Sequence, residues 1–254
     1  MSLPKDRVSI VTTVFNSATT LECCLKSVHS QTFENLEHIA IDGGSTDGSL
    51  EILNRWRPQL AYFESGLDEG IYDGLNRGIQ RASGSIIGIL HSDDFYARPT
   101  AISEVVSQFE NPKVDAVFSD VNYVSSEDPH KIIRDYSSAK WTPNRLAWGW
   151  IPAHPTLFLR REVYERVGLF DISYKIAGDF EFISRAFWQT GIQFSYLPGV
   201  LISMRAGGTS NASWKHRWQC NREIQRACAK NKIPTNLLKL SFRYAYKLAE
   251  FTSG

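Results

Sequence analysis

The first 90 residues alternate short apolar runs with segments whose apolar residues recur at helical spacing. The apolar runs predict strands at residues 7–14, 36–41, 62–64 and 86–90. Helical spacing predicts a helix after each of the first three strands. The apolar faces of these helices carry Leu21, Leu25 and Val28, then Leu50, Leu53 and Trp56, then Ile71, Leu75 and Ile79. This order is typical of a parallel sheet with helices on both faces, so the sequence predicts an α/β fold.

The pattern after residue 100 is less regular. A helix is expected to begin after Pro99 and Thr100, and residues 116–124 and 131–134 resemble a pair of strands with a polar loop between them. Further strands are predicted at residues 156–159, 192–197 and 200–204, with helices at 161–167 and from about residue 179 onward.

Polar residues follow each strand of the predicted parallel sheet. Thr12 and Thr13 end the first strand, Asp42 follows the second, and residues 64–68 and 91–94 follow the third and fourth. Ligands of such sheets bind outside the carboxyl ends of the strands, so these residues are expected to form a site at one edge. The chain has no G-x-G-x-x-G after the first strand and no P-loop, so nucleotide phosphates would have to be held in another way.

Asp93 and Asp94 directly follow the most apolar strand. Two adjacent carboxylates at a buried strand end repel each other and are costly to bury without a partner. A divalent cation such as Mg²⁺ or Mn²⁺ prefers oxygen ligands and is often shared with substrate phosphates, so it would be a suitable partner. The other interpretation is that the two residues cap the following helix, for which Asp is a common choice.

Three further features of the second half could belong to the site. Asp120 lies on a predicted strand and is either a site residue or an ordinary exposed Asp. Three tryptophans between Trp141 and Trp150 could stack on sugar rings or pack a loop onto the core. Asp179 is expected near a helix N-terminus, where it could be a cap or a catalytic base.

Composition and charge narrow the class of protein. With 254 residues, of which 43% are hydrophobic and 22% charged, the chain resembles a globular protein with one main domain. The net charge of +1 argues against a nucleic-acid partner bound by bulk electrostatics. No apolar run approaches the roughly 20 residues that span a bilayer, and no signal peptide is apparent. The four cysteines fit neither a zinc site nor a disulfide framework, which favours a cytoplasmic protein.

The chain from Trp214 onward is basic, with nine Lys or Arg residues against Glu223 and Glu250. Aromatic and leucine residues are interspersed among them. A basic amphipathic helix can lie on an anionic membrane surface, so peripheral contact with the inner face of the cell membrane is one expectation. A helix packed on its own domain is the other.

Several motifs occur together in a particular order: residues 11–16, 41–48, 68–78, 91–94 and 167–171 before Asp179. In this order and spacing they resemble the inverting family 2 glycosyltransferases, over about the first two hundred residues. Bacterial sugar transferases of polysaccharide and O-antigen assembly are especially similar. The resemblance implies the A-type glycosyltransferase fold. It also implies a catalytic domain over residues 1–212, with the donor half at about 1–97 and the acceptor half at about 98–212, and a basic helical extension over 213–254.

The resemblance also implies roles for individual residues. The residues expected to bind the donor are Thr12, Thr13, Asp42, Asp73, Asn76, Ser92 and Asp94. Asp42 would form a hydrogen bond with the base, which is expected to be uracil. Asp93 would bind Mn²⁺ or Mg²⁺, with His91 as a candidate second ligand. Asp94 would contact the waters of the metal or the donor sugar, and Asp179 would be the general base.

Two positions depart from the family pattern. His91 stands where the first Asp of D-x-D is usual, and Gly178 stands where a Glu usually precedes the catalytic Asp. The first departure removes a carboxylate ligand from the expected metal site. The second leaves the catalytic Asp itself in place.

The expected reaction moves a sugar from a nucleotide-sugar, expected to be a UDP-sugar, to a hydroxyl of a saccharide or lipid-linked saccharide. A single displacement would invert the anomeric centre without a covalent sugar–enzyme intermediate. Two alternatives stay open. A sugar-phosphate nucleotidyltransferase should have a Gly-rich loop with a basic residue after its first strand, and Phe15-Asn16-Ser17 has neither. A catalytically inactive nucleotide-sugar or carbohydrate-binding module is disfavoured by the retained aspartates but is compatible with His91.

Overall fold

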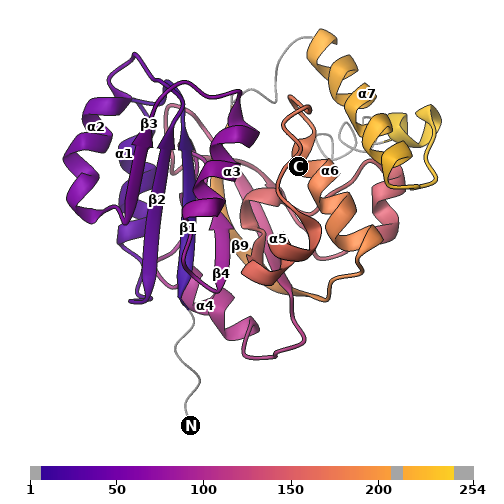
Figure 1. The fold of residues 1–254 in the computed structure, drawn as a ribbon, viewed down its shortest axis with the longest axis horizontal. Helices are drawn as coiled ribbons and strands as arrows, with labels where there is room; N and C mark the ends of the chain where they lie inside the picture. Colours follow the sequence, from indigo (N-terminus) through magenta and orange to yellow (C-terminus); the bar gives the residue numbers. More distant parts are fainter. Residues whose placement is uncertain (1–6, 207–213, 243–254) are drawn as a thin grey trace.

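A computed structural model describes residues 7–206 and 214–242 of the chain. Its strands form one nine-stranded mixed sheet in the order β3-β2-β1-β4-β8-β6-β9-β5, with β7 paired to β6 (Figure 1). The strands are β1 (Val8–Val14), β2 (Leu36–Asp42), β3 (Tyr62–Ser65), β4 (Ile86–Ile89), β5 (Phe95–Tyr96), β6 (Ala116–Val124), β7 (Ile132–Tyr136), β8 (Phe158–Arg160) and β9 (Phe194–Arg205). The predicted α/β fold is confirmed.

The first half of the sheet is parallel, as the alternating pattern predicted. β1 pairs with β2 on one side and β4 on the other, and β2 pairs with β3. The connecting helices are α1 (Leu21–His29), α2 (Ser49–Trp56) and α3 (Ile71–Arg81). α3 lies close against the sheet because Gly78 has no side chain, and a Cβ there would collide with Val11. Every residue of β1 is buried, as expected for a central strand covered on both faces.

The second half changes strand direction. β8 runs antiparallel to both β4 and β6, whereas β9 runs parallel to β6 and antiparallel to β5. The predicted pairing of residues 116–124 with the next strand is confirmed in β6 and β7. Two separate strands at 192–197 and 200–204 were expected. The structure has a single β9 instead, because a register shift opposite Phe118–Asp120 accommodates the Pro198-Gly199 pair.

The remaining helices gather mainly beside this half of the sheet (Figure 1). They are α4 (Ala101–Gln108), α5 (Arg161–Val167), α6 (Gly178–Ile183), which continues as a π-helical segment (Ser184–Gln189), and α7 (Trp214–Lys230). Short 3₁₀ turns occur at Arg57–Gln59, Pro143–Trp148 and His154–Thr156, and residues 237–242, at the end of the described chain, are helical.

The chain after residue 213 packs into the core of the domain. Ile224, Ala227 and Cys228 of α7, followed by Ile233 and Leu240, are buried in the same apolar cluster as α6. α7 therefore packs on the domain, as one of the two interpretations of the basic segment expected. In the part of the chain that the structure describes, no helix is both long and apolar enough to cross a membrane.

Candidate active site

The loops that follow β1 and β2 are joined by hydrogen bonds. The Asn16 side chain accepts a bond from the Thr46 N–H (2.9 Å), and the Asn16 N–H donates to the Ser45 hydroxyl (2.9 Å). The Asp47 carboxylate accepts from the Ala18 N–H (2.9 Å). Asn16 has φ +47°, a left-handed conformation that Asn tolerates better than most residues. The ends of the two strands therefore form one edge.

Asp42 lies buried at the end of β2. Its carboxylate accepts hydrogen bonds from the Gly44 N–H (3.2 Å), from the Ser45 N–H, and from the Ser65 hydroxyl at the end of β3 (2.6 Å). These donors stabilise the negative charge and fix the loop after β2. Any contact of Asp42 with a ligand would be made in addition to these bonds.

Thr12 and Thr13 lie under this edge. The Thr12 hydroxyl is fully buried and lies 2.9 Å from Nε2 of His38. Thr13 packs under α3, where a Cβ on Gly74 would lie 3.1 Å from its methyl carbon. Both residues therefore lie beneath the site at the strand ends.

The two predicted residues of α3 have partners within the protein. The Asp73 carboxylate accepts from Arg77 (2.7 Å) and from the Glu69 N–H (3.2 Å). The Asn76 amide both donates to the Phe170 carbonyl and accepts from the Phe170 N–H, each at 2.9 Å. Asn76 thus fastens the segment before α6 onto α3.

Asp68 is a further carboxylate at this edge. A Cβ added to Gly43 would lie 2.6 Å from its Oδ2, and one added to Gly74 would lie 3.3 Å away. Asp68 therefore lies close to Gly43, which follows β2, and to Gly74 in the first turn of α3. The sequence motif contained Asp68, but no role was assigned to it.

Residues 91–94 form a tight turn after β4, closed by a bond from the Asp94 N–H to the His91 carbonyl (3.0 Å). The Ser92 hydroxyl lies 2.8 Å from that of Ser17, which links the turn to the loop after β1. Asp94 is buried and its Oδ2 has no hydrogen-bond partner. Burial, and secondly the charge of Asp93, raise the pKa of Asp94 well above its ordinary value. Asp93 remains partly exposed.

The helix-capping interpretation of Asp93 and Asp94 is wrong. The chain continues from the turn into β5 and enters α4 only at Ala101. Thr100 occupies the N-cap position and makes no side-chain capping bond. The acidic pair therefore belongs to the strand-end edge.

Asp179 lies in the first turn of α6 and faces the acidic turn through two histidines. Its Oδ2 is 3.3 Å from Nδ1 of His154, and the His154 ring lies 5.6 Å from that of His91, centre to centre. Burial raises the pKa of Asp179 to about 6, against the opposing effects of the Phe180 N–H and His91. Burial also lowers the pKa of His154 to about 4, and burial and His154 together lower the pKa of His91 to about 4. Near neutral pH, a carboxylate therefore faces two neutral imidazoles.

The loop before Asp179 is held from both sides. The Tyr72 hydroxyl donates to the Ile176 carbonyl (2.8 Å) and accepts from the Gly178 N–H (2.9 Å). The Glu223 carboxylate of α7 accepts from the N–H groups of Ile176 and Ala177, each at 2.9 Å, and of Lys175. A Cβ on Gly178 would lie 2.7 Å from the Tyr72 ring. The tyrosine thus occupies the space that a side chain at position 178 would need.

Trp141 of the aromatic segment and Asp120 both have partners within the protein. Trp141 is buried, packs edge-on against Phe118, and donates from its ring N–H to the Trp150 carbonyl (3.0 Å). Both oxygens of Asp120 accept hydrogen bonds at 2.7 Å, from the Ser138 N–H and the Tyr196 hydroxyl. Trp148, in contrast, is exposed.

The family model described as "Glycosyl transferase family 2" matches residues 9–168, which contain the strand-end edge, the acidic turn and His154. This chain belongs to glycosyltransferase family 2. The uncharacterized glycosyltransferase Rv1514c of Mycobacterium tuberculosis is 32% identical over 182 residues, which are 70% of this chain and 68% of that protein. A PGL/p-HBAD biosynthesis glycosyltransferase of Mycobacterium bovis is 29% identical over 212 residues, 80% of this chain and 78% of the relative.

Solved structures confirm the A-type fold of this family 2 glycosyltransferase. S. aureus TarS 1–349 in complex with UDP-GlcNAc matches with a TM-score of 0.70 and 18% identity, over 87% of this chain and 66% of that one. The chain spans only 39% of a longer TarS structure. The mannosyltransferase PcManGT from Pyrobaculum calidifontis, in complex with GDP-Man and Mn²⁺, matches with a TM-score of 0.66 and 20% identity, over 99% of this chain and 76% of that one.

The acidic turn of this glycosyltransferase fits a divalent cation held by few protein ligands. Within the described residues, no three His, Cys, Asp or Glu side chains gather as a complete metal cluster. Asp93 offers a partly exposed carboxylate, and Asp94 has an oxygen without a hydrogen-bond partner. Mg²⁺ and Mn²⁺ are commonly held in this way, by one or two carboxylates together with substrate phosphates. His91 is neutral at pH 7, as a nitrogen ligand must be.

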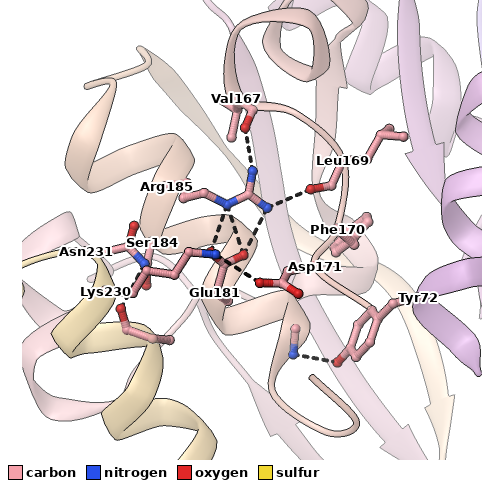
Figure 2. A network of polar contacts seen from close by, with 12 residues as sticks. Tyr72, Val167, Leu169, Phe170, Asp171, Glu181, Ser184, Arg185, Lys230 and Asn231 are labelled. Atoms are coloured by element: carbon pink, nitrogen blue, oxygen red, sulfur yellow. Dashed lines mark hydrogen bonds and ion pairs between the residues drawn. The ribbon is translucent and has the colours of Figure 1, made fainter. Parts of the chain in front are cut away.

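A buried ionic network anchors α6, the helix that carries Asp179. Figure 2 shows Glu181 between Arg185 and Lys230, with Asp171 beside Lys230. Glu181 is fully buried and accepts from Arg185 Nε and Lys230 Nζ at 2.9 Å each. Lys230 Nζ also lies 2.9 Å from Asp171, and Arg185 donates to backbone carbonyls of the preceding loop. The network joins α6, α7 and the segment before α6.

Three residues at or behind the site were absent from the sequence prediction: His154, Tyr72 and Glu223. His154 precedes a proline in a 3₁₀ turn, and its neighbours contain no catalytic pattern. Tyr72 and Glu223 lie on helices whose spacing predicts only burial. Tyr72 is 104 residues away from Ile176 in the sequence, and Glu223 is 46 residues away from Ala177. No local pattern could therefore indicate these contacts.

Proposed function

We propose that this glycosyltransferase moves a sugar from a UDP-sugar to a hydroxyl of a saccharide or lipid-linked saccharide, with inversion, during assembly of a cell-surface polysaccharide such as O-antigen. The observation that carries the proposal is the position of Asp179. Its carboxylate, with a raised pKa, faces the acidic turn across His154 and His91. An acid–base group opposite the diphosphate-binding edge is the arrangement that direct displacement needs.

The donor half is assigned to about residues 1–97, the acceptor half to about 98–212, and the basic extension to 213–254. The loops after β1 and β2 are joined by hydrogen bonds and form one continuous edge for a nucleoside, which supports this assignment. Exposed Phe15, at the end of β1, offers an aromatic face for base stacking. TarS bound to UDP or UDP-GlcNAc, and PcManGT bound to GDP-Man, support a nucleotide-sugar donor.

Within that half, Asp42 would bind the nucleoside, and the buried Thr12 and Thr13 would line its pocket from below. Asp73 and Asn76 would shape the wall formed by α3, and Ser92 and Asp94 would lie nearest the donor sugar. Asp93 would hold Mg²⁺ or Mn²⁺, with His91 as the candidate second ligand. When bound, the cation would neutralise the charge that develops on the departing diphosphate. PcManGT with Mn²⁺ supports this cofactor.

Asp179 would accept the proton of the acceptor hydroxyl as its oxygen attacks the anomeric carbon. The C–O bond to the diphosphate breaks as the new bond forms, so the anomeric configuration inverts. His154 holds the Asp179 carboxylate from one side and remains neutral. Since lipid-linked acceptors lie at the bilayer, we place the reaction at the cytoplasmic face of the cell membrane.

The test of this function begins with calorimetric titration of UDP, GDP and CDP into the protein, with and without Mn²⁺. UDP is expected to bind most tightly and to need the metal. Asp93→Asn should weaken the metal-dependent part of UDP binding, whereas Asp179→Asn should leave it unchanged. With a transferable donor and acceptor, Asp179→Asn should lower kcat by roughly 10²–10⁴-fold, and NMR of the product should show an inverted anomeric centre. Absence of nucleotide binding, or retention of configuration, would contradict the proposal.

A further inference from the structure

We propose that an apolar surface made of Trp148, Leu237, Leu238 and Phe242 docks this enzyme on an anionic phospholipid bilayer. We refer to these four residues as the Trp148 surface. The inference deepens the proposed function, because a transferase that acts on lipid-linked acceptors has to reach the membrane.

The Trp148 surface joins two segments that lie far apart in the sequence. The Thr235 hydroxyl donates to the Ala147 carbonyl (2.7 Å) and so fixes the chain after α7 beside the Pro143–Trp148 turn. The Phe242 ring lies 5.8 Å from that of Trp148, centre to centre, at an interplanar angle of 73°. Lys239 Nζ lies 5.7 Å from the centre of the Trp148 ring. Trp148 and Phe242 therefore lie side by side, and Leu237 and Leu238 belong to the same helical segment as Phe242.

The short helix at residues 237–242 is apolar toward the core and also toward solvent. Leu240 is 1% exposed and packs in the core cluster with α6 and α7. Leu237, Leu238 and Phe242 are 63%, 75% and 62% exposed. A helix on the surface of a globular protein ordinarily has polar residues on its outer side. Large exposed apolar side chains that lie together are typical of an interaction surface.

The charges beside this surface favour a bilayer as the partner. Segments 137–150 and 231–242 contain Lys140, Arg145, Lys232 and Lys239 but no Asp or Glu. Tryptophan, phenylalanine and leucine enter the boundary between headgroups and acyl chains, while lysine and arginine are attracted to anionic headgroups. The combination in these two segments matches both requirements, whereas a purely apolar protein partner would not need these four cations.

This location differs from the one that the sequence suggested. The basic composition pointed to the whole segment from Trp214 onward, including α7. In the structure, Glu223 and Lys230 of α7 are turned toward the loop before Asp179 and toward Glu181. Trp218 of α7 is also exposed, but Arg222 covers its ring at 4.7 Å. Leu237, Leu238 and Phe242 follow α7 and lie with Trp148, which is distant in sequence.

The test is co-sedimentation of the full chain with large vesicles of phosphatidylcholine alone and with one third phosphatidylglycerol. The wild-type protein is expected to bind the anionic vesicles preferentially and less strongly in 0.5 M NaCl. The L237Q/L238Q/F242Q variant should bind them at least about tenfold more weakly. The control I132Q/I133Q, which changes exposed apolar residues of β7, should bind like the wild type. Circular dichroism and UDP binding establish that each variant is folded.

Vesicle binding needs neither donor nor acceptor, so it can fail while the proposed transfer reaction stands, and the reverse. The inference is overturned if the wild type does not sediment with anionic vesicles, or if the triple variant binds them as well as the wild type does. It is also overturned if the triple substitution instead abolishes a dimer seen by light scattering, because the surface would then contact a second copy of the chain.

Discussion

At the scale of single residues, Asp179 shows how burial adjusts the chemistry of one carboxylate. Its side chain is 21% exposed, so a substrate hydroxyl could reach it, yet the surrounding protein disfavours its charge. Its pKa of about 6 is therefore higher than that of an ordinary Asp. A stronger conjugate base accepts a proton more readily, which suits general base catalysis near neutral pH.

The raised pKa of Asp179 predicts the acidic side of the pH profile. In the proposed mechanism the active form is the deprotonated carboxylate, so kcat/KM should rise as pH increases through about 6 and level off above it. Measurement of initial rates at subsaturating acceptor, between pH 4.5 and 8.5, would check this. Circular dichroism at each pH would control for unfolding. A rate that is already constant from pH 4.5 upward would contradict the assignment of Asp179 as the base.

Gly178 explains a departure from the family pattern at the same scale. A Cβ at this position would lie 2.7 Å from the ring of Tyr72, whose hydroxyl is bonded on both sides. Gly178→Ala should therefore destabilise the fold by about 1–3 kcal/mol, measured by urea unfolding. The matched control is Gly66→Ala, because a Cβ on Gly66 would have no neighbour within 4 Å. Equal stability of the two variants would show that Tyr72 moves aside freely.

At the scale of elements, the loop before α6 is positioned by helices from opposite ends of the chain. α3 contributes the Tyr72 hydroxyl and the Asn76 amide, and α7 contributes the Glu223 carboxylate. A carboxylate that accepts several backbone N–H groups makes strong, charge-assisted bonds. Its interactions also hold the pKa of Glu223 below its ordinary value despite the burial. Asp179 thus depends on α7 without touching it.

Glu223→Gln tests this dependence. The amide has one acceptor oxygen and no charge, so the loop should be held less firmly, with a stability loss of about 1–3 kcal/mol. We expect kcat to fall roughly tenfold while the KM for the donor stays unchanged, since a geometry error of about 1 Å at the reacting group impairs mainly the chemical step. Glu165→Gln, at an exposed position of α5, is the control. A raised donor KM with normal kcat would count against a positioning role.

At the scale of the whole molecule, the segment that resembles a separate basic extension is joined to the catalytic body. The network of Glu181, Arg185 and Lys230 connects α6 to α7, and Asp171 connects the preceding loop (Figure 2). Ile224 and Cys228 of α7 are buried among the same core residues. The described part of this segment should therefore unfold together with the rest of the domain.

Glu181→Gln tests how strongly this network stabilises the packing of α7 on the catalytic body. It removes the only fully buried carboxylate of the network drawn in Figure 2 and leaves Arg185 and Lys230 without their common partner. Removing one member of a buried ion pair costs about 3 kcal/mol or more. Thermal and urea unfolding, followed by near-UV and far-UV circular dichroism, should show one cooperative transition shifted to lower stability. The control is Glu162→Gln, at an exposed position of α5. A separate early transition in Glu181→Gln would contradict the prediction, because α7 would then unfold on its own.

Much of the architecture could be predicted from local patterns. The apolar runs and helical spacings that predicted β1 to β4 and α1 to α3 depend on residues a few positions apart, and such residues form hydrogen bonds and faces within one element. The strand-end rule then brought Asp42 and residues 91–94 to one edge, because all parallel strands end on the same side. The family could also be predicted from the sequence, because its motifs follow the strands in a fixed order and spacing.

Tertiary structure decided what each polar residue faces. It separated Asp93 and Asp94 from the helix they could have capped, and it brought His154 beside Asp179 and Glu223 beneath the loop that carries it. It also buried Trp141 while leaving Trp148 exposed, although both lie in one aromatic segment. The physical reason is the same in each case. A periodic pattern reports which side of an element is buried, whereas a contact between distant residues depends on how complete elements pack.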